Sequence, residues 1–257
     1  MTPLNGKRAI VTGASRGIGL AIARSLAEGG ARVALLARNA DRLEQAADQI
    51  GHGALAVVAD VSDPGSVAAA FETVGTKMGG LDILVNNAGV SGLYLIEEAK
   101  DDEVARHVAT NFLSVVYCAR AAIPMLRAAG GGDILNVSSS AVDNPYPYMA
   151  LYAATKAAVE QLSVALRREV RSDGIRVSVF RAGPTWTNFN RDWDPQTAAR
   201  AFAAWTEGGF PGWSGSLEPR VVGEAVASAL CAPAQASMEF FELHPTVNAP
   251  PEPETRE

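Results

Sequence analysis

Seven short runs rich in valine, isoleucine, leucine and alanine recur along the chain, separated by longer segments of helical periodicity. Continuous apolar runs of this kind are typical of strands that are buried on both faces of a sheet. We expect strands at residues 8–12, 32–37, 54–59, 81–86, 133–138, 176–180 and 238–243. Strands that alternate with helices pair in parallel through right-handed crossovers. The pattern therefore predicts an α/β fold with a doubly wound, parallel seven-stranded sheet.

Helical periodicity places the helices between these strands. We expect them at residues 17–28, 41–50, 67–78, 112–129, 151–172, 195–205 and 219–232. Ser62, Asp63 and Pro64 form a good start for the helix at 67–78. The alternation runs without a break in composition as far as Arg181, so residues 1–248 are predicted to form a single domain. The tail at 249–257 is predicted to be disordered.

The composition is that of a folded, acidic protein. Hydrophobic residues make up 48% of the chain, enough for a sizeable core. The net charge is -6, whereas a protein that binds nucleic acid or an anionic membrane needs a basic face. No apolar run approaches the roughly 18 residues of a membrane span, and residues 1–7 do not resemble a signal peptide. We therefore expect a cytoplasmic protein with no nucleic-acid or membrane partner.

The cysteines and histidines suggest neither a disulfide nor a metal site. Cys118 and Cys231 are the only cysteines, and each lies in an alanine-rich helical pattern that suits a small core residue. His52, His107 and His244 are far apart and have no cysteine or histidine at ligand spacing. We therefore expect free thiols and no bound metal ion.

A glycine-rich segment, TGASRGIG, lies between the first strand and the first helix. Its glycines permit a tight turn, and free amides at the start of the helix can receive a pyrophosphate. The spacing alone is weak evidence, since the chain has 24 glycines, but its position is the one that a dinucleotide-binding Rossmann fold requires. The contacts predicted from this loop are Gly13, Ser15, Arg16, Gly17, Ile18 and Gly19.

The end of the second strand indicates which dinucleotide is bound. An acidic residue there binds the ribose 2′-hydroxyl of NAD, whereas an arginine accommodates the 2′-phosphate of NADP. This chain has Ala37 followed by Arg38, and Arg16 can reach the same group. We therefore predict NADP(H) as the cofactor. The alternative is that both arginines are ordinary solvated surface residues.

Tyr152 and Lys156 form a candidate acid–base pair. They stand four residues apart in the helical segment ALYAATKAAVEQL, so their side chains project from one face. A free tyrosine titrates at about 10, and we expect the adjacent ammonium to lower that pKa. Ser139 ends the fifth strand, where its hydroxyl could hold a carbonyl oxygen for protonation.

Together these motifs resemble the short-chain dehydrogenase/reductase family, from residue 7 to about 248. The resemblance rests on TGASRGIG, the pair Asp60-Val61, NNAG at 86–89, Asn111, the serine of NVSSS, and YAATK, all in family order. It implies that Ser139 polarises a carbonyl, that Tyr152 transfers the proton, and that Lys156 binds the nicotinamide ribose and tunes Tyr152. Asn111 would support a water relay to Lys156.

The same resemblance places further residues along the cofactor. They are Asp60, Val61, Asn87, Ala88, Gly89, Gly183, Thr185 and Thr187. On a purely structural interpretation, Asp60 caps the helix that begins near residue 63, and Asn86 and Asn87 only shape a turn. Two departures stand out: the family's proline before Gly183 is Ala182, which could loosen that loop, and Val142 stands where many members carry glycine.

In the family, the substrate lies against the segments after NNAG, between the serine and the tyrosine, and after Gly183. Here these segments supply a mainly aromatic, uncharged wall consisting of Tyr94, Val142, Tyr146, Tyr148, Met149, Trp186 and Phe189. Residues 185–215 are expected to form a lid whose further rings are more often packing than recognition. We expect a moderately apolar ketone or aldehyde as substrate.

The predicted function is therefore NADP(H)-dependent hydride transfer to a ketone or aldehyde, or from a secondary alcohol. Isomerisation, dehydration or double-bond reduction on the same scaffold stays open. A regulator without turnover would lack part of the catalytic set, whereas all four residues of that set are present here. A nucleic-acid or protein-binding module would have a basic face, which the net charge of -6 disfavours. The helices at 112–129 and 151–172 are apolar on more than one face, and the resemblance implies a four-helix dimer contact, so a homo-oligomer, dimer or tetramer, is predicted.

Overall fold

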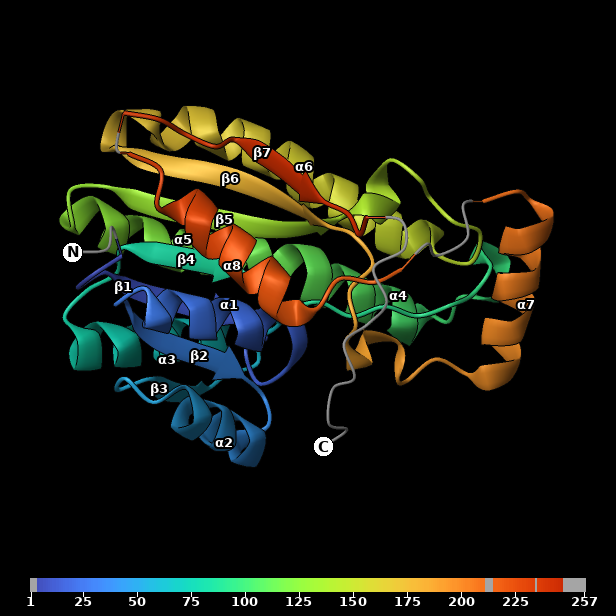
Figure 1. Cartoon of the computed structure of the whole chain (residues 1–257), viewed down its shortest axis with the longest axis horizontal. Helices are drawn as coiled ribbons and strands as arrows, with labels where there is room; N and C mark the ends of the chain where they lie inside the picture. Colours follow the sequence, from blue (N-terminus) through green and yellow to red (C-terminus); the bar gives the residue numbers. More distant parts are fainter. Residues whose placement is uncertain (1–3, 211–214, 234, 247–257) are drawn as a thin grey trace.

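A twisted parallel sheet runs through the centre of the computed structural model, which describes residues 4–210, 215–233 and 235–246 (Figure 1). The strand order is β3-β2-β1-β4-β5-β6-β7, and all neighbours are parallel. The strands are β1 (Arg8–Thr12), β2 (Arg32–Ala37), β3 (Leu55–Val58), β4 (Ile83–Asn86), β5 (Gly132–Ser139), β6 (Ile175–Ala182) and β7 (Phe240–Leu243). The prediction of a doubly wound, seven-stranded Rossmann sheet is confirmed. The tail at 249–257 lies outside the described residues.

Helices cover both faces of this sheet (Figure 1). They are α1 (Gly17–Glu28), α2 (Ala40–Ile50), α3 (Pro64–Met78), α4 (Asp101–Val108), α5 (Ser114–Ala128), α6 (Ala150–Val170), α7 (Pro195–Glu207) and α8 (Pro219–Leu230). In β1, Ala9 and Val11 pack in the core formed with α1 and α8, whereas Ile10 packs in the core formed with α3 and α5. Because successive strand residues face opposite sides, a sheet covered twice needs unbroken apolar runs.

The helix predicted at 112–129 is longer than its apolar pattern indicates. α4 passes through one wide π-helical turn, Ala109–Leu113, into α5. Periodicity missed α4 because the segment is polar, although it carries a different signal: acidic residues in its first turn and basic residues in its last, as the helix dipole favours. π turns recur at functional sites, and this one contains Asn111.

The continuous helical stretch Asp101–Ala128 is, within the described part of the chain, long and apolar enough to cross a membrane by length and composition. The sequence expectation concerned an unbroken apolar run, and this stretch is interrupted by Arg120 and Arg127. Cys118, Ala122 and Leu126 of this stretch pack in the core against the sheet, and core helices of soluble proteins pass the same test of length and composition. Burial raises the pKa of the Cys118 thiol to about 12, and both cysteines are free.

Candidate active site

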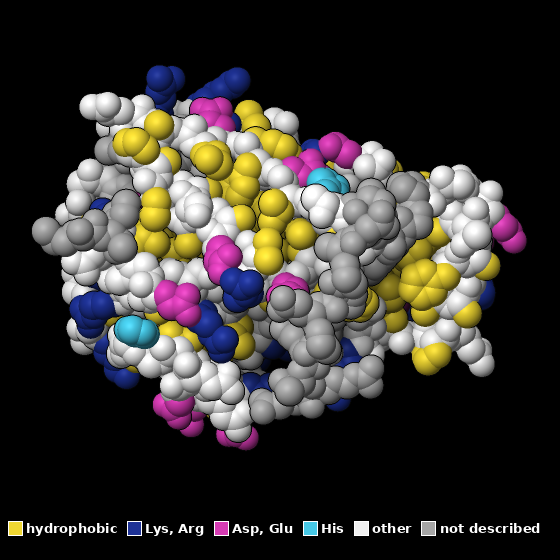
Figure 2. All heavy atoms as spheres, viewed as in Figure 1, with side chains coloured by type: hydrophobic (Ala, Val, Ile, Leu, Met, Phe, Trp, Pro, Cys, Tyr) yellow, Lys and Arg dark blue, Asp and Glu magenta, His cyan; other side chains and the backbone are white. Residues whose placement is uncertain are grey.

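A cleft of 820 Å³ opens at the carboxyl ends of the strands, where the strand order reverses between β1 and β4. Parallel α/β sheets bind ligands at this position because the loops that leave the strands diverge there. The segments that follow all seven strands contribute to its lining. Figure 2 shows acidic and basic side chains interspersed on the face it draws, with no extended basic surface.

The glycine-rich loop after β1 has the backbone that its sequence predicts. Gly13 has a φ of +65°, in the left-handed region that favours glycine. A Cβ atom on Gly19 would lie 2.4 Å from both the Gly13 carbonyl oxygen and Asn87 Nδ2, so a side chain has no room there. All six predicted loop residues line the cleft. The loop leads into α1 at Gly17, which leaves the first amides of that helix free for an anion.

The NNAG segment is tied to this loop. Thr12 Oγ1 accepts hydrogen bonds from the amides of Asn87 and Ala88, both at 3.0 Å, and Asn87 Nδ2 donates to the Thr12 carbonyl at 2.9 Å. The side chain of Asn86 donates to neighbouring β5 at 2.8 Å. The asparagines therefore do shape the turn. Residues 87–89 also line the cleft, and their contact with a cofactor stays a prediction.

Three arginines line the cleft: Arg16 in the glycine-rich loop, Arg38 directly after β2, and Arg42 in the first turn of α2. Sequence reasoning missed Arg42. The signal that could have found it is the helix start, because Asn39 is the N-cap of α2 and its Oδ1 accepts the Arg42 amide hydrogen at 2.9 Å. Three guanidinium groups on one cleft are a suitable environment for a phosphate.

Asp60 and Val61 follow β3 and line the cleft. Asp60 Oδ1 accepts hydrogen bonds from the amide and the hydroxyl of Ser62, at 2.9 and 2.6 Å. Burial opposes ionisation of Asp60, but these hydrogen bonds and the charge of Arg38 outweigh burial and lower its pKa. The cap of α3 is Asp63, which accepts two amides of the first turn. The interpretation of Asp60 as that cap is therefore wrong.

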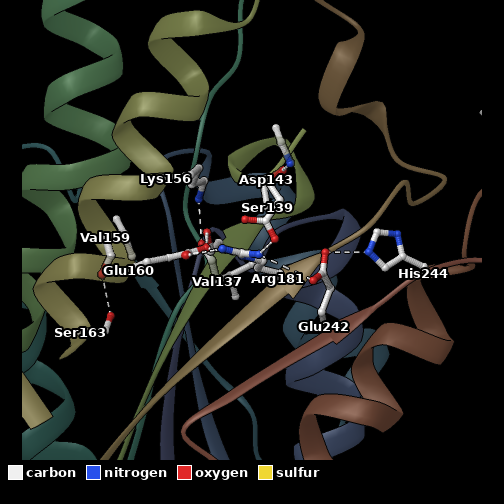
Figure 3. Close-up of polar contacts among 12 residues, drawn as sticks. Val137, Ser139, Asp143, Lys156, Val159, Glu160, Ser163, Arg181, Glu242 and His244 are labelled. Atoms are coloured by element: carbon white, nitrogen blue, oxygen red, sulfur yellow. Dashed lines mark hydrogen bonds and ion pairs between the residues drawn. The ribbon is translucent and has the colours of Figure 1, made fainter. Parts of the chain in front are cut away.

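Ser139, Tyr152 and Lys156 line the cleft where β5 and α6 come together. Figure 3 shows Ser139 and Lys156 in this region. Tyr152 is 7% exposed and Lys156 is 4% exposed. Lys156 Nζ donates to the Val137 carbonyl at 2.8 Å and lies 6.0 Å from the centroid of the Tyr152 ring. The Ser139 and Tyr152 side chains are joined by a hydrogen bond. The structure thus brings together the three groups that the sequence pattern selected.

Burial, rather than Lys156, controls the protonation of Tyr152. It raises the pKa of Tyr152, and the hydrogen bond with Ser139 opposes that rise. Burial also lowers the pKa of Lys156 to about 8, because the ammonium loses its hydration. The expectation that Lys156 lowers the pKa of Tyr152 is not met, since its Nζ is directed at the Val137 carbonyl. At neutral pH Tyr152 is a phenol, the form that can donate a proton.

Asn111 is fully buried in the π turn before α5. Its Oδ1 accepts from the Val90 amide at 2.8 Å, and its Nδ2 donates to the Val90 carbonyl at 3.0 Å and to Thr155 Oγ1 at 3.1 Å. Thr155 directly precedes Lys156 on α6. Asn111 therefore links the segment after NNAG to the helix that carries the tyrosine and the lysine.

The turn after β6 closes another side of the cleft. Gly183, Thr185 and Thr187 all line it. A Cβ atom on Gly183 would lie 2.5 Å from the Leu243 carbonyl oxygen of β7, so glycine is required there even though Ala182 replaces the family's proline. A Cβ atom on Gly17 would lie 3.3 Å from Thr187 Cγ2. The turn therefore faces the glycine-rich loop across the cleft.

Four members of the predicted substrate wall, Tyr146, Met149, Trp186 and Phe189, line the cleft. The other three, Tyr94, Val142 and Tyr148, are described by the structure but do not line it. The Tyr94 hydroxyl lies 3.0 Å from Nδ1 of buried His107, and the Arg200 guanidinium lies 5.5 Å from the Tyr148 ring centroid. Val142 ends a short 3-10 turn beside the cleft. Tertiary packing thus redirects these side chains.

Two tryptophans from the segment after β6 complete the wall. Trp193 and Trp205 line the cleft, and their indole groups donate to Ser91 Oγ at 3.0 Å and to the Pro147 carbonyl at 2.7 Å. The sequence favoured packing for these rings. They pack against other segments and also line the cleft. Among the described residues no group of three histidine, cysteine, aspartate or glutamate side chains could hold a metal ion.

The cleft is lined by the glycine-rich loop, lies where the strand order of the parallel sheet reverses, and contains a buried tyrosine and lysine. These features define a dinucleotide-binding protein of the Rossmann class. Comparison with known proteins narrows the class. Residues 7–198 match the family described as short chain dehydrogenase, and the chain belongs to that family of oxidoreductases.

Individual relatives agree with this assignment. A short-chain type dehydrogenase/reductase of Picea abies is 40% identical over 197 residues, which cover 72% of this chain and 73% of the relative. An alcohol dehydrogenase from the archaeon Thermococcus sibiricus, solved with 5-hydroxy-NADP, is 31% identical with a TM-score of 0.81 over 96% of this chain and 99% of its own. A 3-ketoacyl-(acyl-carrier-protein) reductase from Brucella melitensis, solved with NADH, is 32% identical with a TM-score of 0.82 over 94% and 98%.

Proposed function

We propose that the protein is an NADP(H)-dependent oxidoreductase that interconverts a ketone or aldehyde with the corresponding alcohol. The observation that carries this proposal is the group of half-buried Ser139 and buried Tyr152 and Lys156 in the wall of a cleft that also contains the glycine-rich loop. Related proteins are an alcohol dehydrogenase and a ketoacyl reductase by name, which supports the same class of reaction. We further propose that residues 1–248 form one domain, with 185–215 as its lid, of which residues 211–214 lie outside the described part of the chain.

The cleft fits a dinucleotide with a 2′-phosphate. Glycine at position 19 allows the loop to pack against the Gly13 carbonyl and Asn87, because a Cβ atom there would lie 2.4 Å from each of them. The free amides at the start of α1 suit a pyrophosphate. Arg16, Arg38 and Arg42 supply positive charge on the same cleft, and β2 ends in Ala37 rather than in an acidic residue that would repel a 2′-phosphate. We therefore propose NADP(H) rather than NAD(H). When bound, the reduced nicotinamide supplies the hydride.

The protein side of the reaction follows from the protonation states. The Ser139 hydroxyl can donate a hydrogen bond to a substrate carbonyl oxygen and polarise it. As the carbonyl carbon gains the hydride, Tyr152 gives its phenolic proton to the oxygen and becomes a phenolate. Lys156 then holds positive charge near that phenolate, and the Asn111 region is proposed to return a proton from solvent. In the direction of alcohol oxidation, each of these proton transfers is reversed.

The substrate end of the cleft favours a neutral, apolar ketone. Its described wall beside Tyr152 is formed by Tyr146, Met149, Phe189 and Trp193, and the Phe189 ring lies 5.8 Å from the Tyr152 ring. No guanidinium or carboxylate belongs to that wall. A charged substrate would lose hydration there without gaining an ion pair, which is costly.

A substrate panel tests this proposal. With NADPH in excess, we expect acetophenone and 2-octanone to be reduced with kcat/KM at least about tenfold above that for pyruvate, because an unpaired carboxylate is excluded while each buried methylene gains about 0.8 kcal/mol. Oxidation of NADPH is followed by absorbance. Cyclohex-2-en-1-one, with product analysis, distinguishes carbonyl from double-bond reduction. Consumption of NADPH only with loss of the C=C bond, or no turnover of any carbonyl, would contradict the proposal.

We also propose that the chain forms a homo-oligomer through α5 and α6. Val164 on α6 is 37% exposed, and Val116, Tyr117 and Leu162 are only partly buried, an apolar surface that favours a partner. Light scattering at micromolar concentration should give at least twice the 26.8 kDa of one chain. Val164→Arg should shift the mass toward the monomer, whereas a monomeric wild-type protein would show that this surface has no second copy on it.

A further inference from the structure

Arg181 is a buried arginine near the end of β6 that takes no part in the proposed proton transfers (Figure 3). It is 9% exposed. Its Nε and Nη2 donate to the two carboxylate oxygens of Glu160 at 2.7 and 2.8 Å, and its Nη1 donates to Asp143. The same Nη1 lies 3.8 Å from Glu242 Oε2, and the guanidinium lies 4.7 Å from the centroid of the Phe240 ring. One guanidinium therefore holds three carboxylates.

The carboxylates come from three different segments, and each segment also lines the cleft. Glu160 lies on α6, one helical turn after Lys156 and two turns after Tyr152. Asp143 follows the 3-10 turn that Ser139 caps, and Glu242 lies on β7 two residues before His244, a cleft residue. Arg181 itself lies two residues before Gly183.

The sheet register makes this arrangement compact. Arg181 stands directly beside Ser138 of β5 and Glu242 of β7. The Ser138 hydroxyl donates to Glu160 Oε1 at 2.6 Å, the same oxygen that accepts from Arg181 Nε. Glu160 is therefore bound both to the residue before Ser139 and to β6. This double link fixes the end of β5 against the α6 face that carries Tyr152 and Lys156.

We propose that Arg181 is a positioning residue for the reaction: through Glu160 and Asp143 it fixes Ser139 relative to Tyr152 and Lys156. This inference rests on the proposed function for its effect on turnover. A bidentate arginine–carboxylate pair fixes orientation as well as distance, which a lysine cannot do. A displacement of about 1 Å between reacting groups can cost on the order of a hundredfold in rate, so loss of the fork should appear in kcat.

The same strand provides a matched control. Arg176, at the other end of β6, makes a bidentate ion pair with Asp133 of β5 at 2.7 and 2.9 Å, far in the strand from the cleft residues. Arg176→Lys thus removes a similar fork from a similar place in the sheet. It should lower stability without changing the geometry of the catalytic group.

The experiment compares Arg181→Lys, Glu160→Gln, their combination and Arg176→Lys in the full chain, with NADPH and the panel ketone that wild type reduces fastest. We expect Arg181→Lys and Glu160→Gln each to lower kcat by about tenfold, while the Kd for NADPH, measured by its fluorescence, changes by less than about threefold. Because both substitutions break the same Arg181–Glu160 ion pair, kcat of the double variant should fall by less than the product of the two single factors. Arg176→Lys should keep kcat within about twofold of wild type.

A second measurement is independent of turnover. Hydrogen–deuterium exchange of the peptide at 138–146 should be at least about fivefold faster in Arg181→Lys than in wild type, because the turn after Ser139 loses its anchor, and unchanged in Arg176→Lys. If wild type reduces no ketone, the proposed function fails and exchange alone decides the positioning role. Unchanged exchange in Arg181→Lys, or equal losses of kcat in both arginine variants, would overturn it.

Discussion

Replacing Tyr152 by phenylalanine should abolish nearly all turnover while NADPH still binds. The substitution deletes only the phenolic oxygen, and the ring keeps its packing against Ala141 and Ala153. Removal of one well-placed acid–base group typically lowers kcat by about 100- to 10,000-fold, which corresponds to roughly 2.7 to 5.5 kcal/mol in the barrier. The measurement is NADPH oxidation at saturating ketone, with NADPH fluorescence reporting binding in the same preparation.

The matched control is Tyr148→Phe. Tyr148 lies four residues before Tyr152, just ahead of α6, but its ring lies 5.5 Å from the Arg200 guanidinium and does not line the cleft. It should keep turnover within about threefold of wild type, since it loses only a partly exposed hydrogen bond. If Tyr152→Phe loses less than about tenfold, the phenol is not the proton donor and another group must supply the proton.

Burial of Tyr152 also predicts how the rate of ketone reduction depends on pH. Because its pKa is raised, the phenol persists above neutral pH, so ketone reduction should be retained there and fall as the phenolate forms. The Lys156 ammonium, with a pKa lowered to about 8, loses its charge at a lower pH than that at which Tyr152 ionises. Both groups therefore predict that the reductive activity declines on the alkaline side.

The second large effect should be on the choice of cofactor. Wild type should use NADPH with higher catalytic efficiency than NADH, and Arg38→Ala should weaken NADPH by about ten- to a hundredfold, the equivalent of 1.5 to 3 kcal/mol for a charge-assisted hydrogen bond. NADH should be nearly unaffected because it has no 2′-phosphate. The readout is kcat/KM for each cofactor. Ala37→Asp should shift preference further, since a carboxylate repels the phosphate and accepts from a ribose diol.

Arg24→Ala is the control for a general loss of positive charge. Arg24 is exposed on α1 and does not line the cleft, so its removal should weaken binding of neither cofactor by more than about twofold.

The Brucella melitensis relative was solved with NADH, so members of this structural group differ in the cofactor they are found with. A wild-type preference for NADH, or equal weakening of both cofactors in Arg38→Ala, would show that Arg38 does not contact the phosphate.

The sequence by itself determined the sheet, the glycine-rich loop and the spacing of the serine, tyrosine and lysine. These features are local. An unbroken apolar run specifies a strand covered on both faces, and residues four apart on a helix share a face whatever surrounds them. Asn39 at the start of α2 was an equally local signal, and it would have added Arg42 to the site.

Only the tertiary structure decided which aromatic rings line the cleft, how Tyr152 is protonated, and what Arg181 does. Tyr94 and Tyr148 do not line the cleft, because the Tyr94 hydroxyl is hydrogen-bonded to His107 and the Tyr148 ring packs against Arg200. The pKa of Tyr152 depends on how deeply the surrounding segments bury it, which no spacing along the chain encodes. Arg181 reaches Asp143 and Glu160 across 38 and 21 residues of chain. Such contacts exist only after the strands have taken their order, because the sheet register is what places Arg181 beside Ser138 and Glu242.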